Sequence, residues 1–138
     1  MPAVATREPM LKLSYARSEL ADIDRMRQVH FAALDGMSQR DIANAVRLSQ
    51  ATVHRLIAKA RMLGVHESIE EIVLLRFVGQ IDSREMLRRL TSYEHWVPRV
   101  VDPVDGVLAE DSEAELDTLL EDGFLAEDEV DQIVAAHE

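Results

Sequence analysis

The stretch Gly36–Arg61, GMSQRDIANAVRLSQATVHRLIAKAR, contains two helix-start signals eleven residues apart. Ser38 stands three residues before Asp41, a spacing at which both side chains can bind the free N–H groups of a first helical turn. Ser49 has the residue type of a second N-cap, and Gly64 can end the helix that follows it. The stretch therefore predicts two short helices that are separated by a short joint.

The apolar residues of this stretch have the spacing of two helices that cross at a steep angle. Ala43 is small where the second helix comes closest, and Leu48 can fill the joint. The residues predicted to face inward are Ile42, Ala43, Val46, Leu48, Val53 and Leu56. Polar residues fall between them, so one face of the second helix is left exposed.

A third helix is predicted just before this pair. Apolar residues recur at intervals of three and four between Tyr15 and Asp35, which is typical of one helical face. Pro2 and Pro9 interrupt any such pattern in residues 1–14, which are predicted to form a flexible arm. Residues 15–66 are then expected to form a three-helix domain.

The remaining residues, 67–138, are predicted to form a small helical region, which makes the whole chain all-α. Helix starts are indicated at Ser68, Asp82 and Ser112, with Ala126 as a poorer N-cap. Residues 91–106 contain two prolines and an Asp-Gly pair, and are predicted to be a loop or a short extended excursion.

The balance of basic and acidic residues also changes near residue 66. Residues 1–66 hold 10 Lys and Arg against 6 Asp and Glu, whereas residues 67–138 hold 5 against 20. A net charge of -11 alone would argue against binding to nucleic acid, since phosphate is bound mainly by Lys and Arg. The uneven distribution indicates instead that only the first half is suited to such binding.

Several classes of function have no support in the sequence. Cysteine is absent, so disulfides and thiol chemistry are excluded, and the five histidines have no metal-ligand spacing. We find no phosphate-binding glycine loop, nucleophile motif or paired catalytic carboxylates. No stretch resembles a signal peptide or membrane span. The chain is expected to be a soluble, cytoplasmic non-enzyme without a cofactor or metal.

Residues 20–65, with these caps and this apolar pattern, resemble the helix-turn-helix of bacterial transcriptional regulators. The resemblance is closest to SorC/DeoR-type repressors and to the last DNA-binding region of sigma factors. Arg47 stands where these families usually have glycine, so it must accept a left-handed backbone or alter the joint. The resemblance implies a sequence-specific repressor or autoregulator that binds double-stranded DNA, most simply as a homodimer.

The resemblance also implies roles for individual residues, because the start of the second helix faces base edges in this family. Gln50 can read adenine, Arg55 can read guanine and Ala51 can contact a thymine methyl group. The complete set of predicted DNA-binding residues is Gln39, Arg40, Ser49, Gln50, Ala51, Thr52, His54, Arg55 and Lys59. Ser49 and Thr52 suit a phosphate or a base edge, while Gln39, Arg40 and Lys59 suit phosphates. The alternative is a pair of packed helices with a solvated basic face, on which His54 is only a surface residue.

The acidic half has two interpretations. Its charge can simply keep the protein soluble. Alternatively, its apolar residues can present a face to a basic protein such as a toxin; those expected to do so are Leu116, Leu119, Leu120, Phe124 and Leu125. By architectural analogy, a DNA reader joined to an acidic segment is the layout of an antitoxin that represses its own operon. The 73 residues after Val65 are too few for the large ligand-binding domain of a SorC-type repressor.

Overall fold

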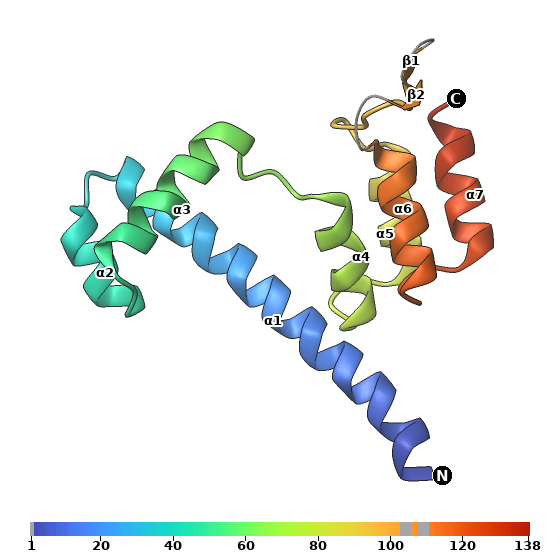
Figure 1. The fold of residues 1–138 in the computed structure, drawn as a ribbon, viewed down its shortest axis with the longest axis horizontal. Coiled ribbons are helices and arrows are strands. Elements are labelled where there is room, and N and C mark those ends of the chain that lie inside the picture. The colour runs from blue at the N-terminus through green and yellow to red at the C-terminus, as the bar shows by residue number, and fades with distance from the viewer. Residues whose placement is uncertain (1, 103–105, 108–110) are drawn as a thin grey trace. The chain divides into compact units, whose positions relative to one another are not determined.

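The computed structural model describes the backbone of residues 2–102, 106–107 and 111–138 and the side chains of residues 7–100 and 111–138. The described chain is all-α apart from one two-residue ladder (Figure 1). The elements are α1 (Pro2–Leu34), α2 (Gln39–Val46), α3 (Gln50–Leu63), α4 (Ile69–Phe77), α5 (Ser83–Thr91), β1 (Val101–Asp102), β2 (Gly106–Val107), α6 (Ser112–Glu121) and α7 (Glu127–Ala136). Met1 and residues 103–105, which belong to the predicted arm and loop, lie outside the described residues.

Two compact units make up the chain. The middle unit is Arg17–His66, and the outer unit combines Met1–Ala16 with Glu67–Glu138. The middle unit holds 8 Lys and Arg against 5 Asp and Glu, and the outer unit holds 7 against 21. The change of charge along the sequence therefore follows the division between the two units.

The N-terminal residues differ from the expected flexible arm. Helix α1 begins at Pro2 and continues through Pro9. Proline is tolerated at the first helical position because that N–H has no intrahelical partner, whereas Pro9 costs one hydrogen bond. Contacts within the outer unit compensate: Lys12 donates to the carbonyl of Asp122 (2.8 Å) and Tyr15 packs on Phe124, with ring centroids 5.9 Å apart. These contacts join segments far apart in sequence, so periodicity alone did not reveal them.

The core of the middle unit brings α1, α2 and α3 together. Val29 packs with Ile42 and Ala43 from α2 and with Val53 and Ile57 from α3. The six residues predicted to face inward are all buried or partly buried. Ile57 was not among them, although its position four residues after Val53 places it on the same face.

Helices α4, α5, α6 and α7 form the core of the outer unit. Helix α4 packs on α5 and α6, and α7 packs on the same two helices. The fully buried side chains of this core include Ile72, Leu74, Met86, Leu90, Leu116 and Ile133. The hydrophobic effect of burying them is the main stabilising contribution to this unit.

Two similar turns join these helices in pairs. Gly79, between α4 and α5, has φ of 83°, and Gly123, between α6 and α7, has φ of 82°. In each turn the next N–H bonds five residues back, from Gln80 to Leu75 and from Phe124 to Leu119, both at 2.9 Å. This left-handed C-terminal motif favours glycine, which has no Cβ to strain the backbone.

The predicted helix starts are confirmed with one correction. The side chains of Ser68 and Asp82 accept hydrogen bonds from the N–H groups three residues on. For α6 the N-cap is Asp111, whose carboxylate accepts from the N–H of Ala114 at 2.7 Å. Ser112 is instead the first helical residue, and its hydroxyl accepts from the N–H of Val97. Asp and Ser are both good N-caps, so an Asp followed by a Ser leaves the predicted start of the helix uncertain by one residue.

Arg76 links the two helix pairs of the outer unit. Its guanidinium forms a two-bond pair with Glu129, at 2.8 and 3.0 Å, and donates to the carbonyl of Phe124. Glu129 also accepts from the N–H of Ala126, so one free N–H at the start of α7 is satisfied although the alanine side chain cannot act as an acceptor. Burial raises the pKa of Glu129, but its bonds from Arg76 and Ala126 outweigh this effect and hold the pKa below its usual value.

The segment between α5 and α6 is anchored to the end of the chain. The indole of Trp96 stacks on His137, with ring centroids 4.0 Å apart, and His137 Nε2 lies 2.7 Å from the carbonyl oxygen of Leu90. Strands β1 and β2 pair antiparallel, with Val101 opposite Val107. Part of the predicted loop is therefore extended, as expected. Among the described helices, none combines the length and apolar character needed to cross a membrane.

We predict that Arg76→Met lowers the free energy of unfolding of the outer unit by about 2 kcal/mol at pH 7, because Glu129 and a carbonyl lose their partner. The folded pKa of Glu129 lies below its usual 4.5, so the stabilisation is present above pH 4.5 and lost as the pH falls through the folded pKa. The loss should therefore be smaller at pH 3. Urea unfolding followed by Trp96 fluorescence measures it.

Arg84→Met is the matched control, since Arg84 is exposed on α5 and forms no ion pair among the described residues. Its unfolding free energy should change by less than about 0.5 kcal/mol. Equal losses for the two variants would contradict the role given to Arg76.

Candidate nucleic-acid interface

The joint between α2 and α3 depends on one residue with a left-handed backbone. Arg47 has φ of 58° and ψ of 43°, the only positive φ of a non-glycine residue in the described chain. The N–H groups of Arg47 and Leu48 both bond to the carbonyl of Ala43. The chain turns within three residues, and Ser49 then caps α3 by accepting from the N–H of Thr52 at 3.1 Å.

The start of α3 presents an exposed polar row. Gln50, Ala51, His54 and Arg55 are exposed, whereas Val53, Ile57 and Ala60 are buried against the core. Residues three and four apart share a face of an α-helix, so the exposed four lie together on the side away from the core. The row holds an amide, a methyl group, an imidazole and a guanidinium. The amide, imidazole and guanidinium can form hydrogen bonds with base edges, and the methyl group can pack on them.

Local hydrogen bonds hold several of these side chains. The Thr52 hydroxyl lies 2.8 Å from that of Ser49 and accepts from Nη2 of Arg55 at 3.1 Å. The amide nitrogen of Gln39, at the start of α2, lies 3.5 Å from Nδ1 of His54. Thr52 is partly buried, unlike its exposed neighbours. Its hydroxyl is therefore used within the protein and is less available to a ligand than the sequence indicated.

Five cations lie in this row or elsewhere on α2, α3 and their joint, and they have no acidic partner among the described residues. Arg40, Arg47, Arg55, Lys59 and Arg61 are all exposed, and none forms an ion pair within the part of the chain that the structure describes. The outer unit is different, since at least five of its seven Lys and Arg side chains pair with carboxylates. The positive charge on α2 and α3 is thus uncompensated, which favours the approach of a polyanion.

The structure places all nine predicted DNA-binding residues on α2, α3 and the cap between them. Eight are exposed, and Thr52 is the exception. Arg47 and Arg61 add exposed charge to the same helices. Pairs within one helix have a spacing that the sequence shows, whereas those of Arg76 and Arg99 could not be read from it, because their carboxylates lie in other segments.

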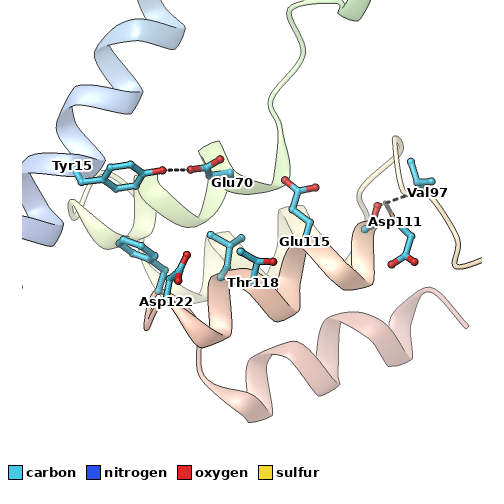
Figure 2. Close-up of a pocket in the computed structure, with 10 residues that line it drawn as sticks. Tyr15, Glu70, Val97, Asp111, Glu115, Thr118 and Asp122 are labelled. Carbon is cyan, nitrogen blue, oxygen red and sulfur yellow. Dashed lines mark hydrogen bonds between the residues drawn. The ribbon is translucent and has the colours of Figure 1, made fainter. Parts of the chain in front are cut away.

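An acidic cavity of about 490 Å³ opens in the outer unit. Figure 2 shows Tyr15 and Glu70, which come from α1 and α4, pointing toward one another, and their hydrogen bond is 2.7 Å long. The wall opposite is formed by Glu115 and Thr118 of α6 and by Asp122, which caps its C-terminal end. Carboxylates and aromatic rings in one cavity can hold a cationic side chain.

One carboxylate at the end of this cavity is held in its ionised form. The N–H of Ala114 and the guanidinium of Arg99 hold the pKa of Asp111 below its usual value. Arg99 lies 3.1 Å from Asp111 and within 4 Å of Glu113 and Asp117. One arginine therefore faces three carboxylates, so α6 keeps an excess of negative charge.

The residues expected to face a partner require a correction. Leu116, Leu119, Phe124 and Leu125 are buried in the core of the outer unit, and Leu120 is partly buried. Leu116 and Leu119 lie on α6, which packs on α4 and α7, whereas Phe124 and Leu125 lie in the turn after α6. An amphipathic pattern does not show which element covers the apolar face. Among the described residues, no three His, Asp or Glu side chains are arranged so that they could hold a metal ion.

Comparison with protein families, with curated proteins and with solved structures finds no match for this chain.

We predict that Arg47→Gly stabilises the middle unit by about 0.5 to 1 kcal/mol, because glycine adopts the left-handed conformation without the strain of a Cβ. Amide hydrogen exchange of α2 and α3 should slow accordingly. Arg47→Ala removes the same charge but keeps the Cβ, so it should give no gain. A gain of similar size from alanine would show that charge, and not backbone strain, limits stability here.

Proposed function

We propose that the chain is a sequence-specific DNA-binding transcriptional regulator, a repressor or autoregulator, in which α2 and α3 form a helix-turn-helix. In this proposal α3 lies in the major groove, and the start of α2 contacts the phosphate backbone. The observation that carries the proposal is the set of unpaired cations around the exposed row on α3. These cations form no ion pair among the described residues, so their charge is available to attract the phosphates of DNA.

In this proposal the exposed row on α3 contacts the base edges. Gln50 has the donor and acceptor needed for adenine, Arg55 has the paired donors needed for guanine, and Ala51 can pack on a thymine methyl group. Gln39 and Arg40 start α2, where free N–H groups and the helix dipole favour a phosphate. Lys59 and Arg61 lie further along α3 and extend the phosphate contacts.

A homodimer belongs to the proposal, because one such module buries little surface on DNA and binds weakly alone. A two-fold symmetric dimer requires a near-palindromic site whose half-sites lie about 34 to 36 Å apart. Selection of duplexes from a randomised library, followed by footprinting, reveals such a site.

We predict that Arg55→Ala and Gln50→Ala each lower the affinity for the selected site by about 1 to 3 kcal/mol and leave binding to unrelated DNA nearly unchanged. Arg40→Ala should instead weaken binding to both DNAs alike and reduce the salt slope by about 1. Mobility shifts at several salt concentrations measure both quantities. If the unchanged protein binds all duplexes equally, or if neither Arg55→Ala nor Gln50→Ala alters the affinity for the selected site, base readout by α3 is ruled out.

A second candidate function is binding of a basic protein by the outer unit, as in an antitoxin that also represses its own operon. The acidic cavity is the observation that favours it, since the carboxylates of α4 and α6 meet there beside Tyr15 and Phe124. This surface replaces the buried leucines as the proposed contact. A Lys or Arg side chain of the partner would enter the cavity.

We predict that Glu115→Gln combined with Asp122→Asn weakens binding of a basic protein encoded beside this gene at least tenfold, because two charge-assisted contacts are lost. Calorimetry with the purified pair measures the affinity, and growth on co-expression measures protection. The matched control is Asp128→Asn with Asp131→Asn, which removes the same charge from exposed positions on α7. Equal effects of the two double variants would assign binding to net charge and not to the cavity.

A further inference from the structure

We infer that Thr52 is a positioning residue for Arg55, and that the preference for one guanine in the DNA site depends on its hydroxyl. The inference rests on the proposed function and deepens it. It changes the role expected of Thr52 from a contact with DNA to a contact that holds another side chain.

Three hydrogen bonds carry the inference. The Ser49 hydroxyl oxygen caps α3 by accepting from the N–H of Thr52 at 3.1 Å, and it lies 2.8 Å from the Thr52 hydroxyl oxygen. The Thr52 oxygen accepts from Nη2 of Arg55 at 3.1 Å. The guanidinium is therefore connected through Thr52 to the capped end of the helix.

Rigidity of Thr52 makes this connection effective. Threonine is branched at Cβ, so few χ1 rotamers are open to it in a helix. Its side chain is also partly buried and its hydroxyl bonds to Ser49, which restricts it further. Arg55 is exposed, and among the described residues it forms no ion pair and its side chain hydrogen-bonds only to Thr52.

Arg55 keeps enough donors for DNA in this arrangement. A guanidinium has five N–H groups in a fixed plane, and one of them is used by Thr52. Two parallel donors remain for the O6 and N7 acceptors of guanine. A side chain that is already ordered loses less conformational freedom on binding, so the correct base gains affinity that a freely moving arginine would not provide.

The test compares Thr52→Val with Thr52→Ser in the full-length chain. Valine has nearly the shape of threonine but no hydroxyl, whereas serine keeps the hydroxyl. Affinity is measured for the duplex selected from a randomised library and for the same duplex with adenine at the position where Arg55→Ala loses its preference. Both variants are also measured on an unrelated duplex.

We expect the unchanged protein to favour guanine by about 5-fold to 150-fold. Thr52→Val should reduce this preference at least threefold without weakening binding to the unrelated duplex, and Thr52→Ser should retain it. An unchanged preference in Thr52→Val, with Arg55→Ala still losing it, would overturn this inference and leave the proposed function standing. If selection enriches no sequence, both fail.

A measurement without DNA covers the case in which Thr52→Val disturbs folding. Nitrogen-15 relaxation at Nε of Arg55 reports how freely the guanidinium moves. The side chain should be ordered in the unchanged protein and in Thr52→Ser, and mobile in Thr52→Val. Equal mobility of Arg55 in the unchanged protein and in an exposed reference such as Arg61 would overturn the inference.

Discussion

The left-handed backbone at Arg47 is the constraint on which the candidate interface depends. It lets two successive N–H groups share the carbonyl of Ala43 and brings Ser49 to the position from which it caps α3. A helical conformation at this residue would continue α2, and the exposed row would lose its position relative to the core. A strained conformation of this kind persists only when the surrounding packing compensates for it, and here Ile42, Val53 and Ile57 provide that packing.

The two units differ more clearly in how their Lys and Arg side chains are paired with carboxylates than in their net charge. In the outer unit, arginines such as Arg76, Arg89 and Arg99 bind carboxylates from other parts of the same unit. In the middle unit, the cations on α2 and α3 form no ion pair with any carboxylate of the described residues. Ion pairs at an exposed surface contribute little to stability, so leaving these charges unpaired costs the fold little and keeps them available to a polyanion.

The acidic unit shows how an amphipathic pattern can be misassigned. Leu116, Leu119 and Phe124 have the spacing of a contact face, and the prediction that they face another protein treated them as exposed. The two leucines are buried because α4 and α7 pack on α6, and Phe124, in the turn after α6, packs on Phe77 of α4. What the unit offers at its surface is charge, concentrated where α4 and α6 bring carboxylates to one cavity.

Local chemistry in the sequence determined most of the middle unit. Ser38 and Ser49 start their helices, Gly36 and Gly64 adopt positive φ, and the spacing of Ile42, Val46 and Val53 selects the inner face. These features depend on neighbours in the chain, so they could be predicted. The tertiary structure decided which helices cover the leucines of α6, why α1 extends to Pro2, and which cations lack partners. Each of these depends on contacts between residues far apart in the chain, and periodicity and caps carry no information about such contacts.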